Sequence, residues 1–134
     1  MRSRALVGVV FFIGILSVGT FASSGASVAP AKQSAIVNFM EPVSVNGNLL
    51  MGSYLIVHDE GKMARGEPCT TFYRFDRSKG PREEEVTFMC RPEQRTVCDK
   101  TTFSVVRDSL TDPTRRLVEF QFAGDSEGHG IPAR

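Results

Sequence analysis

The chain has 134 residues, the length of one ordinary domain, and carries 16 basic and 15 acidic side chains. This even balance argues against nucleic-acid binding, which needs a clustered excess of positive charge. Tryptophan is absent and only two tyrosines occur, which weakens a sugar-binding interpretation that would rely on exposed aromatic platforms. The protein is therefore expected to be a single domain without a nucleic-acid partner.

Residues 1–26 have the pattern of a secretory signal peptide. Two arginines among the first four residues precede an apolar run that ends near residue 21, and small residues follow it. We expect a signal helix that is cleaved after Ala26 or, alternatively, after Ala22. An uncleaved helical anchor remains the other interpretation, because the apolar run approaches the length of a membrane span. Cleavage predicts a periplasmic or secreted protein that makes no membrane contact.

The export segment also changes the charge and the expected domain limits. Two of the basic residues and none of the acidic ones lie in it, so the remaining chain has a net charge near −1. Residues 27–34 are small and polar, and are predicted to form a flexible leader. Residues 35–124 are predicted to form the folded domain. Residues 125–134 are rich in glycine and are predicted to be a flexible C-terminal tail.

Between residues 35 and 124, short strand-like runs alternate with turn signals. Asn46-Gly47 is the strongest hairpin signal, because this dipeptide accepts the positive φ angles of a type I′ turn. No window after the signal segment has the period of an amphipathic helix. The sequence predicts an all-β fold, an antiparallel β-sandwich or small barrel of about six to eight strands. The expected strands fall within residues 35–40, 42–50, 52–59, 69–75, 84–90, 96–106 and 115–122.

Three cysteines follow the export segment, namely Cys69, Cys90 and Cys98. Export permits a disulfide, and an odd number leaves at least one thiol free, metal-bound or paired between chains. The stretch CRPEQRTVC reads as a hairpin that would bring Cys90 and Cys98 into opposition. We therefore favour a Cys90–Cys98 disulfide over either pairing with Cys69. Two buried thiols are the alternative, and spacing alone does not fix the connectivity.

The stretch HDEGKMARGEPC, residues 58–69, joins two expected strands by a connection longer than most hairpin loops. Its His58, Met63 and Cys69, together with His129 of the tail, are candidate metal ligands. Imidazole, thioether and thiolate suit copper, especially Cu(I), and zinc is the other candidate. The opposing interpretation is a solvated strand end, since two basic side chains in the loop would repel a cation and no established metal-binding spacing is present.

Enzymatic interpretations rest on less. The sequence contains no G-x-S-x-G, P-loop or G-x-G-x-x-G motif, and no catalytic residue is assigned. A cysteine–histidine pair built from Cys69 with His58 or His129 is conceivable. Any chain with this number of cysteines and histidines offers such pairs, so the signal is not specific.

One stretch resembles a known group of proteins. Residues Asn38 to Asp59 carry a strand, then PV-x-V-x-G, a leucine, G-x-Y and a second strand. The matching positions are Pro42, Val43, Val45, Gly47, Leu49, Gly52 and Tyr54. This pattern is similar to the opening of small exported bacterial all-β proteins of uncharacterised function. The resemblance implies an exported β-domain and implies no functional residues; the cysteine-bearing stretch that follows departs from it.

Three functional hypotheses follow from these observations. The leading one is an exported, non-enzymatic binding or envelope-associated domain, which would have no cofactor and would bind an unknown small ligand or envelope protein. The second is a metal-handling protein, which requires the residue 58–69 loop and the tail to converge. The third is a small cysteine-dependent enzyme, which requires an exposed Cys69 with a lowered pKa and a histidine within hydrogen-bond reach.

Overall fold

The computed structural model describes residues 32–134, so the predicted signal helix and most of the predicted leader lie outside the described residues. The described chain is all-β, with one sheet of eight strands and one five-residue helix. No helix in this part of the chain is long and apolar enough to span a membrane. The elements in order are β1 (Lys32–Val45), β2 (Asn48–Asp59), α1 (Glu60–Ala64), β3 (Thr70–Asp76), β4 (Gly80–Phe88), β5 (Arg91–Gln94), β6 (Thr102–Arg107), β7 (Arg115–Gln121) and β8 (Glu127–Gly130).

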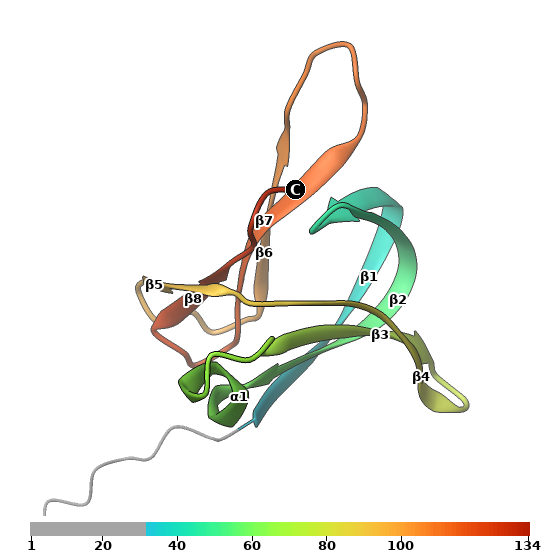
Figure 1. The fold of residues 1–134 in the computed structure, drawn as a ribbon. Helices are drawn as coiled ribbons and strands as arrows, with labels where there is room; N and C mark the ends of the chain where they lie inside the picture. Colours follow the sequence, from blue (N-terminus) through green and yellow to red (C-terminus); the bar gives the residue numbers. More distant parts are fainter. Residues whose placement is uncertain (1–31) are drawn as a thin grey trace, which may run out of the picture.

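The strand order explains which parts of the sequence become neighbours. It runs β4-β3-β2-β1-β7-β8-β5, and β6 pairs with β7 outside this path (Figure 1). The all-β prediction is confirmed, and all but one of the strand pairings in the described residues are antiparallel. β1 and β7 pair in parallel at Val43–Arg115 and Ser44–Arg116, and the mixed sheet is not closed into a barrel.

β1 and β2 form a long bent hairpin (Figure 1). Its turn is the predicted Asn46-Gly47, where φ is 47° and 84°, as a type I′ turn requires. Farther along, the register shifts between Phe39 and Val43, and Gly52, opposite Phe39, has φ of 95°. A bulge of this kind bends both strands and tolerates Pro42, which has no N–H to donate to the sheet.

Alternation along the strands places one apolar face in a shared core. Tyr54, Ile56, Phe72 and Phe120 are almost completely buried. Phe72 of β3 meets Phe120 of β7 edge-to-face, with ring centroids 6.4 Å apart. This contact packs the β1–β4 half of the chain against the β5–β8 half, which strand hydrogen bonds join only through the short β1–β7 pairing among the described residues.

Three sequence predictions are corrected by the fold. The C-terminal residues are not a tail outside the sheet, because residues 127–130 form β8 between β7 and β5 and Ile131 is buried. Residues 32–34 of the predicted leader belong to β1, where they pair with the end of β2. The hairpin predicted between Cys90 and Cys98 does not form, because Arg91–Gln94 pairs with β8 instead.

Candidate metal centre

Four potential metal ligands meet where the ends of β2, β3 and β4 approach β8. His58 is the penultimate residue of β2, Cys69 immediately precedes β3, Cys90 follows β4, and His129 lies in β8. Antiparallel pairing aligns these ends, since Cys69 N–H donates to the Phe88 carbonyl at 3.1 Å. The two histidines are fully buried and the two cysteines are at most 6% exposed. The fold thus gathers both histidines of the chain and two of its three cysteines in one interior cluster.

The Cys90 sulfur lies at the centre of this cluster. Its Sγ is 3.4 Å from Cys69 Sγ, 3.6 Å from His58 Nδ1 and 3.6 Å from His129 Nδ1. Donor atoms of His58, Cys69 and Cys90 all lie within 4.8 Å of one another, so these three residues could hold a metal ion. Donor atoms of His58, Glu127 and His129 form a second such group, in which they also lie within 4.8 Å of one another.

The hydrogen bonds of His58 define which of its ring nitrogens is free to bind a metal. Nε2 lies 2.9 Å from Glu60 Oε1, and Nδ1 lies 3.1 Å from Thr70 Oγ1. An ionised carboxylate only accepts hydrogen bonds, so Nε2 carries the proton. Nδ1 is then left with a lone pair directed towards the Thr70 hydroxyl and the Cys90 sulfur. A carboxylate behind a ligating histidine is a recurrent feature of protein metal sites, because it fixes the ring and its tautomer.

His129 is held by aromatic rings rather than by strong hydrogen bonds. Its ring stacks on Phe120 with centroids 5.0 Å apart and meets Phe122 edge-on at 5.4 Å. Burial, and secondarily the proximity of His58, lower the pKa of His129 to about 4. The ring is therefore neutral near pH 7, which is the state that binds metals. Its buried Nε2 has no hydrogen-bond partner among the described residues and lies 3.9 Å from Asp125 Oδ2.

Carboxylates surround the histidine pair on its more exposed side. Glu127 Oε1 lies 3.8 Å from His129 Nδ1 and is itself buried without a hydrogen-bond partner. Burial and the nearby charges of Glu60 and Asp125 raise the pKa of Glu127. Such crowding of acidic groups costs free energy in a site without a cation, and a bound cation would relieve it.

The chemical environment suits metal binding better than nucleophilic catalysis. A reactive cysteine needs partial exposure and a stabilised thiolate. Cys69 is only 2% exposed, contrary to what the enzyme hypothesis requires. Burial raises the pKa of Cys90 to about 12, so its thiol is protonated at neutral pH in the metal-free protein.

The sequence-predicted site residues divide into those that meet and those that do not. His58, Cys69 and His129 converge as the metal hypothesis requires. Met63 is half-buried on α1 and packs against the hydrophobic core, and its role as a ligand stays a prediction. Cys90 was missed as a ligand, although it alternates in sequence with Val86 and Phe88, and all three side chains are buried.

The Cys90–Cys98 disulfide predicted from the sequence is not formed in this structure. All three cysteines are free thiols. Cys98 is half-buried, and its S–H donates to the Phe122 carbonyl at 3.4 Å, whereas Cys90 lies against Cys69. Cys90 and Cys98 do not meet because the predicted hairpin between them does not form. The chain continues from Cys90 into β5 instead of turning back.

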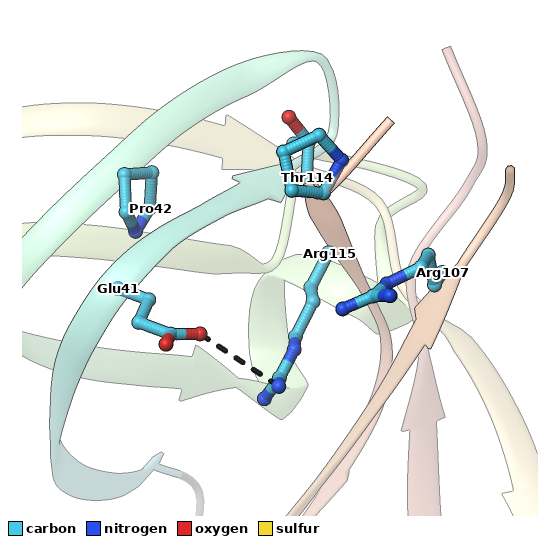
Figure 2. A pocket seen from close by; sticks show the side chains of 6 residues that line it. Glu41, Pro42, Arg107, Thr114 and Arg115 are labelled. Carbon is cyan, nitrogen blue, oxygen red and sulfur yellow. Dashed lines mark ion pairs between the residues drawn. The ribbon is translucent and has the colours of Figure 1, made fainter. Parts of the chain in front are cut away.

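Two surface pockets in the described part of the chain lie away from this cluster. One, of about 360 Å³, is lined by Glu41, Pro42, Arg107, Pro113, Thr114 and Arg115 (Figure 2). The Arg115 guanidinium reaches Glu41 across it at 3.7 Å. A second is formed by residues of β1 and β6 and shares Glu41 and Arg115 with the first. Neither pocket is lined by a residue of the His–Cys cluster. The cluster therefore lies in the interior, and neither of these two pockets would give a substrate access to it.

Comparisons with known proteins do not assign this site. No protein-family model matches the chain, and comparison with curated proteins and with solved structures gives no match either. The interpretation of the cluster therefore rests on its own geometry and chemistry.

Proposed function

We propose that this protein is an exported, non-enzymatic β-domain that binds one Zn²⁺ ion through His58, Cys69, Cys90 and His129. The observation that supports this proposal most strongly is the position of the Cys90 sulfur. It contacts one thiol and two imidazole nitrogens at once, at 3.4, 3.6 and 3.6 Å.

These separations are close to those between the ligands of one tetrahedral zinc ion. With Zn–S of about 2.3 Å and Zn–N of about 2.0–2.1 Å, tetrahedral angles separate two sulfurs by about 3.8 Å and a sulfur from a nitrogen by about 3.6 Å. Van der Waals packing alone would not require three polar atoms to surround one buried sulfur. His58, Cys69 and Cys90 already offer donor atoms within 4.8 Å of one another, whereas under that limit His129 is grouped with His58 and Glu127 and not with Cys69. Binding of all four donors to one ion would therefore require the His129 ring to move towards Cys69.

The ligand set favours zinc over copper. Two thiolates and two imidazoles in tetrahedral geometry are typical of zinc, whereas the copper prediction combined thiolate and imidazole with the thioether of Met63. Met63 packs against the core, and four other donors already complete a coordination shell. A site with four protein ligands and no open position is typical of structural zinc, which supports a non-enzymatic role.

The unpartnered groups of the metal-free cluster also support the proposal. Buried polar side chains usually have hydrogen-bond partners, yet His129 Nε2 and Glu127 Oε1 have none among the described residues. A metal on Nδ1 would leave Nε2 protonated and facing Asp125. The carboxylate would then orient His129 in the way that Glu60 orients His58.

Export is part of the proposal and rests on the sequence of residues 1–26 alone. A basic start, an apolar middle and a small-residue end direct a chain out of the cytoplasm. An envelope protein or a small ligand outside the cytoplasm remains the expected partner of the domain, in line with the leading hypothesis from the sequence.

The test is metal stoichiometry measured by native mass spectrometry and by Co²⁺ substitution. Reduced, metal-free protein is titrated with Zn²⁺, and the visible absorption of the Co²⁺ form reports thiolate ligation in a tetrahedral site. We expect one ion per chain. Substitutions Cys69→Ser, Cys90→Ser, His58→Gln and His129→Gln should each weaken zinc binding by more than about 100-fold, since each removes a direct ligand.

Cys98→Ser is the matched control, because it removes the one cysteine outside the cluster and should leave affinity and spectrum unchanged. Absence of stoichiometric binding to reduced wild-type protein would overturn the proposal. Equal loss in Cys98→Ser would do the same. Tight binding of Cu(I) with no binding of Zn²⁺ would overturn the choice of metal and restore copper.

A further inference from the structure

The two cysteines of the cluster are close enough to bond to each other. Their sulfurs are 3.4 Å apart, and a disulfide bond is about 2.0 Å long, so an approach of roughly 1.4 Å would join them. We infer that Cys69 and Cys90 are a disulfide-forming pair whose two states, zinc-bound dithiolate and disulfide, exclude each other. The zinc-bound state rests on the proposed function, whereas the disulfide does not.

The backbone around the pair is compatible with a bridge. Thr70 of β3 pairs with Phe88 of β4, and Cys69 N–H still donates to the Phe88 carbonyl. Continuing this register past the end of the ladder sets Cys69 opposite Met89, so Cys90 lies one residue beyond the opposed position. The chain after β4 nevertheless brings Cys90 Sγ to 3.4 Å from Cys69 Sγ. Both lie just outside the strand limits, so closing the bond would not break the regular ladder.

The chemistry requires an oxidant, which we identify by class as a small-molecule or protein disulfide, RSSR. The Cys69 thiolate attacks one sulfur of RSSR, forms a mixed disulfide and expels RS⁻. The Cys90 thiolate then attacks the Cys69 sulfur, which forms the Cys69–Cys90 bond and expels a second RS⁻. The pair loses two electrons and RSSR gains them. Any zinc held by the thiolates leaves as Zn²⁺, with no change in its oxidation state.

Competition follows because both states use the same sulfur lone pairs. After oxidation only the two imidazoles and nearby carboxylates remain, so the tetrahedral thiolate site is lost. Conversely, zinc occupies both thiolates and keeps them from attacking RSSR. Both sulfurs are buried in the folded domain, so oxidant reaches them when the chain is opening or has not yet closed. The state of the pair would then depend on whether zinc or the oxidant reaches the two thiols first during folding.

The experiment refolds reduced protein in a glutathione/glutathione disulfide buffer, with and without excess Zn²⁺. Intact mass after thiol blocking counts the bridges, and peptide mapping locates them. Without zinc we expect a loss of two hydrogens assigned to Cys69–Cys90, and at least a tenfold smaller oxidised fraction with zinc. The oxidised protein should bind zinc more than 100-fold more weakly, and reduction should restore binding.

Cys98→Ser is again the matched control and should oxidise like the wild type, whereas Cys69→Ser and Cys90→Ser should lose the intramolecular bridge. A Cys90–Cys98 bridge, or no bridge at all, would overturn the inference. A Cys69–Cys90 bridge that leaves zinc affinity unchanged would overturn the mutual exclusion. If the bridge forms but reduced protein binds no zinc, the disulfide pair stands and the proposed zinc function fails.

Discussion

The rings of His58 and His129 lie with their centroids 4.3 Å apart in the protein interior, although one belongs to β2 and the other to β8. They are the only two histidines in the chain. Two buried imidazoles in contact are costly if either is protonated, and the pKa of His129 is lowered by its burial and, secondarily, by the proximity of His58. Their contact makes the C-terminal strand part of the same site as the β2–β4 strand ends.

Removal of the C-terminal strand should destroy the site. A chain ending at Gly124 lacks β8 and His129, and it uncovers the face of Phe120 on which His129 stacks. It also removes the buried Ile131, whose burial alone is worth roughly 1.5–3 kcal/mol. We expect the free energy of unfolding to fall by at least about 3 kcal/mol in urea titrations, with loss of zinc binding.

A chain ending at Ile131 is the matched control for this truncation. It removes only the last three residues, of which Ala133 and Arg134 are exposed. Stability and zinc binding should be retained. If the chain ending at Gly124 kept both, residues 125–134 would be the dispensable tail that their glycine content first indicated.

Glu60 should act as a positioning residue for His58. Its carboxylate accepts from Nε2 at 2.9 Å and so directs Nδ1 towards the cysteines. Glu60→Ala should weaken zinc binding by about 10–100-fold, as loss of such a partner typically does. Glu60→Gln, which retains an acceptor, should recover part of the affinity in the same competition titration with a chelator.

Glu67→Ala controls for the loss of one negative charge near the site. Glu67 belongs to the same loop, but it pairs with Arg65 at the surface. We expect no more than a twofold change in zinc affinity. Equal weakening in Glu67→Ala and Glu60→Ala would mean that general electrostatics, and not the hydrogen bond to His58, accounts for the effect.

Acid should destabilise the metal-free protein through His129. Its pKa is about 4 in the folded protein and 6.5 when unperturbed, so the unfolded chain binds more protons between these values. The free energy of unfolding therefore falls as pH is lowered from about 6.5 to about 4, by up to about 3 kcal/mol. The raised pKa of Glu127 has the opposite sign and offsets part of the loss near its own range. The titratable or charged groups that face His129 are His58, Cys90, Glu119, Asp125 and Glu127.

Urea unfolding at a series of pH values, in the presence of a chelator, measures this dependence. His129→Gln should flatten the curve between pH 6.5 and 4.5, because it removes the group that the unfolded chain protonates. A slope as steep as that of the wild type in this variant would assign the acid sensitivity to other side chains.

Met63 should be replaceable without loss of the metal. It packs against the core from α1, and Met→Leu exchanges of similar volume usually cost less than about 1.5 kcal/mol. We expect the zinc affinity of Met63→Leu to be within twofold of that of the wild type. Cys69→Ser, measured in the same titration, is the positive control for loss of a ligand. A large loss of affinity in Met63→Leu would reinstate the thioether as a ligand and, with it, the case for copper.

Local patterns in the sequence predicted β1 to β4, β6 and β7, because each pattern depends on neighbouring residues, but they missed β5 and β8. The Asn46-Gly47 turn and the alternation in Arg115–Gln121 require no knowledge of the rest of the chain. The pairing of β1 with β7 and of β5 with β8 joins segments far apart in sequence, and no local pattern encodes such partners. For this reason the fold class was predicted, whereas the mixed, open sheet was not.

The same distinction applies to the site. His58, Cys69 and His129 were selected by residue type, which is visible in the sequence. Cys90 was assigned to a hairpin disulfide because Arg91–Gln94 reads as a turn, whereas β8 is available to pair with it only in the folded chain. Glycines at 128 and 130 indicated disorder, but in the sheet they fit a close approach, since a Cβ at Gly128 would lie 2.6 Å from Glu119 Oε1.

The short parallel pairing between β1 and β7 has a consequence for how the domain unfolds. Among the described residues it is the one strand pairing that joins the β1–β4 and β5–β8 halves, and it spans two residue pairs. So short a pairing allows one half to unfold locally before the other. Amide hydrogen exchange would then show two different levels of protection, one for each half. Three of the proposed ligands come from one half and His129 from the other. A bound ion would therefore cross-link the two halves of the sheet. The two halves would then unfold together in one cooperative transition.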